Sequence, residues 1–427
     1  MRVVRVYHSG RSPGHRARER ALVAAGVDLT LVIPSNWTEG GAEAALSPEA
    51  FPVIELPVKR PDDVNRHSYV SSTDLRSAIL TAQPDVVDIH EEPFSSVMRQ
   101  VLGVLPTSLP AVGYAAQNVD KRYPPPFNSW ERSAYSRLAA IYPCSRQAAS
   151  VVRGRGYSGI LNVLPLGYDP DLFHQGDQRQ DDDVWTVSIA GRLVHEKGIR
   201  DAMLAFASVE RPARLVIAGS GPLSETIPAW SAELGIADRV SQPGWLAPQA
   251  VAGLYRESHV VLVPSVSTTR WVEQFGRMVV EAQACGAVVA GYASGSLPEI
   301  CQGAAVLAAE GDTLGLGRSL ADLSLMPGMW AERRATGLRL AEQSRWEAVA
   351  RKQAGMYDRS LAQSGTWVTP GSRELAVAEF GATASLRGGA SRPFALPVLR
   401  QLPRLAKAVD RWDRLRRSQT TIRDELL

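Results

Sequence analysis

Hydrophobic residues follow two alternating patterns along the first 165 residues of the chain. Short runs rich in β-branched residues, typical of buried strands, lie at residues 3–7, 29–33, 86–90, 111–114 and 140–143. Between these runs, residues 15–25 and 75–82 carry apolar side chains at helical spacing. Strands that alternate with helices predict a parallel sheet covered by helices.

A polar segment at residues 174–183, HQGDQRQDDD, separates this pattern from a second one of the same kind. The second series predicts strands at residues 186–190, 214–218, 240–242, 260–263 and 287–290. It predicts helices between them, notably at residues 200–209, 248–257 and 279–285. Two such halves predict a cleft between them, which is a common place for a ligand.

The aspartates at positions 181, 182 and 183 within the polar segment raise the question of a metal site. No other type of ligand residue is spaced around them. We therefore interpret the segment as a solvated acidic linker between two domains.

Composition narrows the class of protein. The chain has 427 residues, more than one hydrophobic core usually serves, and 45% of them are apolar, as in folded proteins. A formal net charge of +3 with mixed signs argues against nucleic-acid binding. The three cysteines, Cys144, Cys285 and Cys301, are expected to be buried thiols, because a disulfide framework needs more of them. With neither a signal-like start nor an apolar run of about 20 residues, we expect a cytoplasmic protein.

The alternating pattern weakens from residue 365 onward, and residues 386–417 hold nine basic residues against two acidic. Their apolar positions at helical spacing are Leu405, Val409, Trp412 and Leu415. A basic amphipathic helix of this kind can lie on an anionic membrane surface. The alternative is a helix that packs on the rest of the protein or forms an oligomer contact.

The strongest chemical signal is the segment EQFGRMVVE at residues 273–281, which follows a predicted buried strand and leads into a helix. Its two carboxylates, Glu273 and Glu281, can both face the crevice at the strand's end and accept hydrogen bonds from sugar hydroxyls. Gly276 allows backbone amides at the helix start to approach a diphosphate, where the helix dipole favours an anion.

The second signal is the loop GRLVHEKG at residues 191–198, directly after a predicted strand. Its two cations, Arg192 and Lys197, are suited to a clamp for a leaving diphosphate, whose charge develops as the glycosidic bond breaks, although basic loops after strands are common.

A third signal is the loop AGSGP at residues 218–222, which has Gly219 and Gly221 but lacks the last glycine of a dinucleotide fingerprint. We place Pro222 where a helix opens. Together with Trp245 and Leu246, these glycines fit the rim of a nucleotide pocket.

In this order and spacing, the three segments resemble the large retaining family-4 glycosyltransferases of the GT-B fold. The resemblance covers about residues 1–360, and its specific part is the second half. There the E-x7-E pattern, the basic pair, and the loops at 219–222 and 295–299 match the family. Residues 166–173 resemble its crossover between domains, and residues 346–357 its closing helix.

The resemblance implies an α/β protein with two Rossmann-like parallel-sheet domains facing each other across a cleft, and a C-terminal helix crossing back. Residues 1–165, completed by about 345–362, would form the acceptor domain. Residues 166–344 would form the donor domain, and residues 365–427 a basic extension.

The resemblance also implies roles. Glu281 would hold the nucleotide ribose, Glu273 the donor-sugar hydroxyls, and Arg192 with Lys197 the diphosphate. Phe275 and Gly276 would present backbone amides. The co-substrate would be a UDP- or GDP-sugar, the acceptor a sugar, a lipid-linked or a small molecule, with retention of configuration. No metal or other cofactor would be required.

The first half departs from the family pattern in two places. The glycine-rich loop after the first strand reads HSGRSPG, in which Gly14 is the match. Gln117 stands where many relatives have a histidine, and Gln cannot titrate near neutral pH. His90, at a strand end, is a candidate lining residue of the acceptor pocket, although a purely structural histidine fits equally.

Three other functions remain to be compared with a transferase. An epimerase or phosphorylase can use the same fold, but we find no motif for a phosphorylase cofactor lysine. A catalytically inert relative would be expected to have lost one of the Glu, Arg and Lys residues, and all four are present. A nicotinamide dehydrogenase fits poorly with the incomplete glycine pattern.

Overall fold

The computed structural model describes residues 1–38, 48–176, 184–269 and 271–364. The linker residues 177–183, with their three aspartates, and the basic extension at 365–427 lie outside the described residues. The membrane-surface interpretation of residues 386–417 therefore stays a prediction.

The first half forms a seven-stranded parallel sheet in the order β3-β2-β1-β6-β7-β8-β9. Its strands are β1 (Arg2–Val6), β2 (Asp28–Pro34), β3 (Val53–Leu56), β6 (Val86–Ile89), β7 (Ala111–Ala115), β8 (Ala140–Pro143) and β9 (Ile160–Leu161). A separate antiparallel pair consists of β4 (Val58–Lys59) and β5 (Ser68–Tyr69).

The second half forms a six-stranded parallel sheet in the order β12-β11-β10-β13-β14-β15. Its strands are β10 (Trp185–Ala190), β11 (Ala213–Ala218), β12 (Val240–Gly244), β13 (Val260–Val263), β14 (Val288–Tyr292) and β15 (Val306–Ala308). β10 and β13 are buried along their whole length, as expected for central strands covered on both faces.

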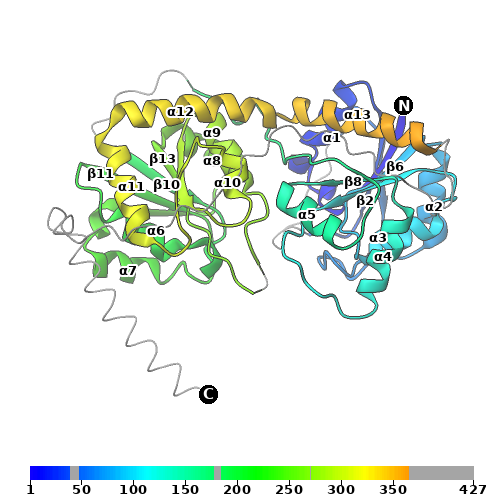
Figure 1. Cartoon of the computed structure of the whole chain (residues 1–427), viewed down its shortest axis with the longest axis horizontal. Coiled ribbons are helices and arrows are strands. Elements are labelled where there is room, and N and C mark those ends of the chain that lie inside the picture. Colours follow the sequence, from blue (N-terminus) through cyan, green and yellow to red (C-terminus); the bar gives the residue numbers. More distant parts are fainter. Residues whose placement is uncertain (39–47, 177–183, 270, 365–427) are drawn as a thin grey trace, which may run out of the picture. The chain divides into compact units, whose positions relative to one another are not determined.

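Helices accompany both sheets (Figure 1). Those of the first half are α1 (Ala17–Ala24), α2 (Ser72–Thr81), α3 (Ser96–Val104), α4 (Phe127–Arg137) and α5 (Arg146–Gly154). Those that follow β10 are α6 (Ile199–Phe206), α7 (Ile227–Leu234), α8 (Pro248–Glu257), α9 (Arg277–Ala284), α10 (Leu297–Cys301), α11 (Thr313–Leu325), α12 (Pro327–Ala341) and α13 (Trp346–Ser364).

The hydrophobic pattern predicted the central strands of both sheets well and the strands at the sheet edges poorly. β8, β13 and α8 have the predicted bounds, whereas β3, β9 and β15 were not predicted. These three strands are short and lie at sheet edges, so most of their residues are only partly buried. The placement of Pro222 at a helix opening was wrong, because α7 begins at Ile227.

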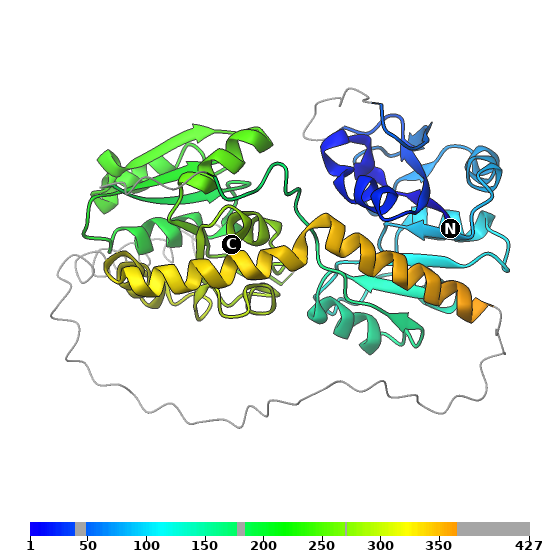
Figure 2. The ribbon, with the colours of Figure 1, turned by 90° about the horizontal axis from the view of Figure 1, so that it is seen from above.

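The C-terminal helix α13 crosses back to the first sheet, as the fold class predicted (Figure 2). It packs on α1, and its Met356 and Tyr357 are fully buried among first-half residues. At its start, Trp346 packs against Gly167, and the next residue, Tyr168, forms a strand-like bridge with Arg345. The crossover segment therefore lies against the turn that leads into α13.

The three cysteines are buried free thiols, as predicted. Burial raises the pKa of each to about 12, so they are neutral at physiological pH.

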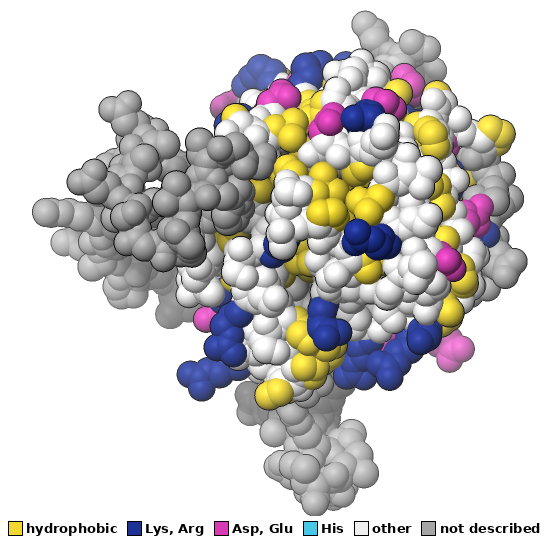
Figure 3. Space-filling view, turned by 90° about the vertical axis from the view of Figure 1, so that its right-hand side faces the viewer, with side chains coloured by type: hydrophobic (Ala, Val, Ile, Leu, Met, Phe, Trp, Pro, Cys, Tyr) yellow, Lys and Arg dark blue, Asp and Glu magenta, His cyan; other side chains and the backbone are white. Residues whose placement is uncertain are grey.

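Basic side chains gather mainly at the margins of the face shown in Figure 3, around a central group of hydrophobic ones. In the part of the chain that the structure describes, no helix is long and apolar enough to span a bilayer.

Glycine is required at position 219 for a steric reason. Gly219 has a φ of 138°, and a Cβ there would overlap the carbonyl oxygen of Gly191 in the loop after β10. A Cβ added at Gly253, in α8, would meet open space, because its nearest neighbour, a guanidinium nitrogen of Arg256, lies 4.0 Å away.

We predict opposite effects of one substitution at these two glycines. Gly219→Ala should lower the free energy of unfolding by about 3 kcal/mol or more, because backbone must move. Gly253→Ala should leave it unchanged or raise it by about 0.5–1 kcal/mol, as in other helix interiors. Urea denaturation of both variants measures the difference, and equal effects would contradict the steric argument.

Candidate functional site

The residues predicted to bind the donor lie on loops after two neighbouring central strands. The basic loop follows β10, and the Glu273 segment follows β13, its neighbour in the sheet. The strand order reverses at this point, because β11 lies on one side of β10 and β13 on the other. Ligands of parallel α/β sheets commonly bind at such a reversal, beyond the carboxyl ends of the strands.

Glu273 is the centre of this donor-side cluster. Its Oε2 atom accepts a hydrogen bond of 2.6 Å from Lys197 Nζ and one of 2.8 Å from Ser265 Oγ. The Lys197 ammonium also lies 5.0 Å from the ring centroid of Trp271, where a cation is attracted to the ring. The structure thus joins two predicted residues directly and adds Ser265 and Trp271, which sequence reasoning missed.

Arg192, the other predicted cation, lies on the same loop and is exposed. Arg192, Lys197 and Ser265 line one small hollow beside the start of α9. Both residues of the predicted clamp therefore border the same hollow.

The backbone of Glu273 is held by both halves of the chain. Its carbonyl oxygen accepts hydrogen bonds from Ser296 N at 3.1 Å and from Asn118 Nδ2 at 2.8 Å. Asn118 belongs to the first half, next to Gln117, so it links the two halves at the predicted catalytic residue. A second link joins the loop at 295–299 to the first half, since the Glu299 carboxylate accepts from Arg146 N at 2.9 Å.

Gly276 begins α9 with a left-handed φ of 73°, and a Cβ there would lie 2.9 Å from Leu297 Cδ2. The Phe275 side chain is buried in the core, so only its backbone can face a ligand. Glu281 lies one turn into α9 and forms an ion pair of 3.0 Å with Arg277. Burial raises the pKa of Glu281, while Arg277 acts in the opposite direction.

The predicted rim residues follow β11 and β12. A Cβ on Gly221 would overlap the carbonyl oxygen of Leu193, so Gly219 and Gly221 make room for the basic loop that passes beside them. Trp245 directly follows β12 and is 70% exposed, whereas Leu246 is half-buried. An exposed ring at this sheet edge is suitably placed to stack on a base.

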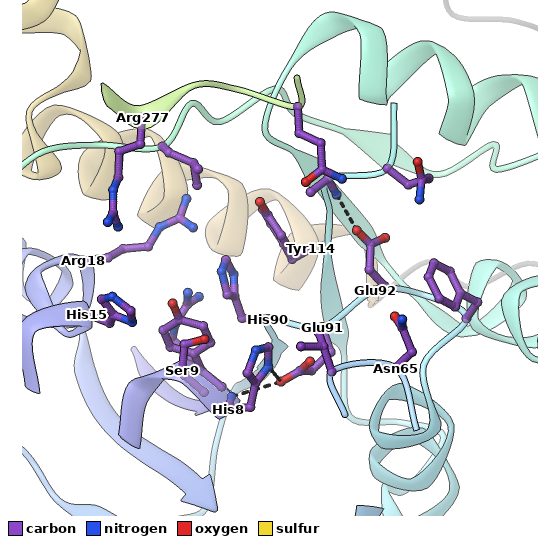
Figure 4. A pocket seen from close by; sticks show the side chains of 18 of the residues that line it. His8, Ser9, His15, Arg18, Asn65, His90, Glu91, Glu92, Tyr114 and Arg277 are labelled. Atoms are coloured by element: carbon purple, nitrogen blue, oxygen red, sulfur yellow. Dashed lines mark hydrogen bonds and ion pairs between the residues drawn. The ribbon is translucent and has the colours of Figure 1, made fainter. Parts of the chain in front are cut away.

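The first-half residues line a different hollow, a cavity of about 660 Å³ (Figure 4). Gly14, Gln117 and His90 all lie in its lining, beyond the carboxyl ends of neighbouring strands. Of the described residues that line it, none is Arg192, Lys197 or Glu273. The cavity is nevertheless lined by Gln274 and Arg277 of the donor-side segment, so it borders that segment as well as the first half.

His90 is buried in the wall of this cavity. Its Nδ1 lies 3.0 Å from the hydroxyl of Tyr142, and its ring stacks on Tyr114 at 4.0 Å between centroids. Burial lowers the pKa of His90 well below its usual value, and the cations Arg5 and Arg18 lower it further. The ring is therefore neutral, which suits hydrogen bonding rather than proton uptake.

Comparison with known proteins shows which family the second half of the chain matches. Residues 173–329 match the model of the family described as Glycosyl transferases group 1. A D-inositol 3-phosphate glycosyltransferase of Segniliparus rotundus is 34% identical over 152 residues, which are 32% of this chain and 33% of that protein. Residues 173–329 belong to the glycosyl transferases group 1 family.

Other members support the assignment. A 2-deoxystreptamine glucosyltransferase of Streptomyces kanamyceticus is 28% identical over 202 residues, 44% of this chain and 51% of that protein. The chain thus spans about a third to a half of the length of these curated relatives.

Solved glycosyltransferase structures show that the fold extends over both halves. Sucrose-phosphate synthase from Thermosynechococcus elongatus has a TM-score of 0.65 at 17% identity, covering 85% of this chain and 99% of that one. The lipopolysaccharide glycosyltransferase WaaG has a TM-score of 0.57 at 15% identity, covering 84% and 99%. The predicted GT-B fold is confirmed.

One group among the described residues has the side-chain types of a metal site. His8, His67 and Glu91 bring ligand atoms within 4.8 Å of one another. Glu91 Oε1 already accepts from the backbone and ring of His8, at 3.0 and 2.7 Å. These hydrogen bonds account for the arrangement of the three side chains without an ion. That the reaction needs no metal stays a prediction.

Glu92, which sequence reasoning missed, also lines the cavity. Its Oε1 accepts a hydrogen bond of 2.9 Å from Ala116 N. Burial raises the pKa of Glu92 to about 7, although the backbone amides of Ala116 and Gln117 oppose the shift. This carboxyl group therefore changes its charge near neutral pH.

The raised pKa predicts a pH-dependent stability. The folded chain keeps the Glu92 proton up to about pH 7, whereas the unfolded chain loses it near the ordinary glutamate pKa of 4.5. Stability contributed by this group therefore falls as the pH rises between those values. Glu92→Gln should gain stability over the wild type at about pH 8 and little at about pH 4.5.

Urea unfolding at both pH values measures this difference. Glu332→Gln, at an exposed position of α12, is the matched control and should show no such pH-dependent gain. An equal gain at the two pH values would mean that Glu92 is not the titrating group.

Proposed function

We propose that this chain transfers a sugar from a nucleoside-diphosphate sugar to an acceptor hydroxyl, with retention of configuration and without a metal ion. The observation that carries the proposal is the Lys197–Glu273–Ser265 cluster at the strand reversal of the second sheet. The cluster lies within residues 173–329, the segment that belongs to the family. Among the similar structures, HepE of Anabaena, with a TM-score of 0.63 at 16% identity, was solved with UDP and glucose.

In this proposal the donor diphosphate lies between Arg192, Lys197 and the start of α9. An ammonium group has three donors, so Lys197 can bind Glu273 and a phosphate oxygen together. The backbone amides of Phe275 and Gly276 add donors at the positive end of the helix dipole. Negative charge that develops on the leaving diphosphate is stabilised by groups already in place.

The carboxylates bind the neutral parts of the donor. Glu273 accepts hydrogen bonds from hydroxyls of the transferred sugar, while its salt bridge to Lys197 holds the carboxylate in position. Glu281 uses the oxygen not bound to Arg277 for the ribose, and Trp245 and Leu246 flank the base.

The acceptor enters from the first-half cavity and attacks on the face that the phosphate vacates. Neutral His90 and Gln117 orient it by hydrogen bonds. The acceptor proton goes to an oxygen of the leaving phosphate, so the reaction requires no histidine base. The bond broken joins the anomeric carbon to the phosphate oxygen, and the bond formed joins that carbon to the acceptor oxygen.

Removing either cation tests the clamp. Arg192→Ala and Lys197→Ala should each raise the activation free energy by about 2–4 kcal/mol, a fall in kcat of roughly 30- to 1000-fold. Arg318→Ala, at an exposed position of α11, is the matched control and should turn over normally. Near-normal kcat in both loop variants would overturn the assignment.

A thermal-shift screen tests the donor class and the metal requirement together. One series among UDP-, GDP- and ADP-sugars should raise the melting temperature, because a ligand that binds only the native state stabilises it. The shift should persist in EDTA. Donor binding without sugar transfer would indicate a catalytically inert relative. A shift in melting temperature that EDTA abolishes would contradict metal independence and point to His8, His67 and Glu91 as a metal site.

A further inference from the structure

Arg18, on α1, is a buried charge for which the described residues supply no hydrogen-bond partner. Its side chain lines the first-half cavity, and the residue is only 3% exposed. All three guanidinium nitrogens are buried without a hydrogen-bond partner among the described residues. The group does lie over two rings, Tyr142 at 5.2 Å and Trp346 at 5.4 Å.

Ring contacts alone leave five N–H donors unused. A guanidinium group stays charged in proteins, so it cannot reduce the cost of burial by losing its proton. Figure 4 shows Arg18 extending from its helix into the cavity, on the side of His90 and Arg277. Its donors are therefore directed at the space that a ligand would fill.

The acidic groups of the cavity are already engaged elsewhere. Glu19 pairs with Arg5, and Glu91 accepts from His8. Glu92 accepts a backbone hydrogen bond from Ala116, and burial holds its pKa near 7.

The remaining charged lining residues are basic, and neutral His90 adds no charge. They are Arg66, Lys121 and Arg277, the last of which pairs with Glu281. The cavity is therefore suited to an anion at Arg18.

The position of Arg18 indicates the acceptor side. It belongs to the first sheet's half, and Arg192 and Lys197 line a different hollow, although Gln274 and Arg277 of the donor-side segment also line the cavity of Arg18. The donor diphosphate of the proposed function already has those two cations. Arg18 is therefore available to a different anionic group.

We propose that Arg18 binds an anionic group, phosphate or carboxylate, carried by the acceptor. The planar guanidinium fork matches the oxygens of either group in two parallel hydrogen bonds. This inference rests on the proposed function, because it names the chemistry of that enzyme's acceptor.

The test uses the full chain and inorganic phosphate as the probe. Phosphate is titrated calorimetrically, at constant ionic strength, into a background carrying Arg192→Ala and Lys197→Ala, which removes the donor-side cations. Adding Arg18→Gln should weaken phosphate binding about 10- to 100-fold, as expected for charge-assisted hydrogen bonds. Arg20→Gln, at an exposed position of the same helix, is the matched control and should change it less than about twofold.

UDP binding by the otherwise wild-type chain separates the two sources of phosphate. Arg18→Gln should leave UDP affinity unchanged, whereas Arg192→Ala should weaken it. An equal loss of UDP and phosphate binding in Arg18→Gln would assign Arg18 to the donor and overturn the acceptor assignment. If the wild type binds phosphate at Arg18 but no nucleotide, the proposed function fails and the anion site stands.

A second measurement does not depend on how the variants fold. Phosphate should slow the modification of Arg18 by phenylglyoxal in the wild type, followed by mass spectrometry, and should not slow that of Arg20. Circular dichroism and the melting temperature show whether Arg18→Gln folds. Arg18→Lys, which keeps the positive charge, should retain part of the phosphate affinity. Unchanged phosphate binding in Arg18→Gln, or no protection of Arg18, would overturn the proposal.

Discussion

The first half depends on one buried charge, the guanidinium of Arg5. Arg5 is fully buried on β1 and forms ion pairs with Asp88 of β6 and Glu19 of α1. Asp88 also accepts hydrogen bonds from Tyr142, Gln353 and Tyr357. A buried charge that loses its partner is strongly destabilising, so these groups must converge. Through these hydrogen bonds, the network holds α13, which follows the second half in the chain, against the first sheet.

The same network places the cavity's functional groups. Tyr142 binds Asp88 and His90, and its ring lies under Arg18. The acids nearest Arg5 are engaged by it, which leaves Arg18 as a buried cation without a hydrogen-bonded acid. The two hollows thus differ in charge balance. On the donor side Lys197 is compensated by Glu273, whereas no described acid forms a hydrogen bond with Arg18.

The two halves are coupled where the chemistry is proposed to occur. The Asn118 side chain holds the backbone of Glu273, whose carboxylate in turn binds Lys197 and Ser265. A change in the first half can therefore shift the position of a donor-side carboxylate. This coupling gives a physical reason for a donor and an acceptor to be brought together in one arrangement.

Local sequence determined the central strands, several of the helices and the positions of Glu273, Arg192 and Lys197 beyond strand ends. It did so because buried β-branched runs and strand-to-helix loops have a strong local signature. The short strands β3, β9 and β15 lacked that signature, since they lie near sheet edges and are only partly buried. Tertiary structure alone decided that Lys197 meets Glu273, 76 residues away, and that Asn118 meets it from 155 residues away. It alone left Arg18 without an acid among the residues that the structure describes, because whether a charge is paired depends on neighbours that only folding brings together.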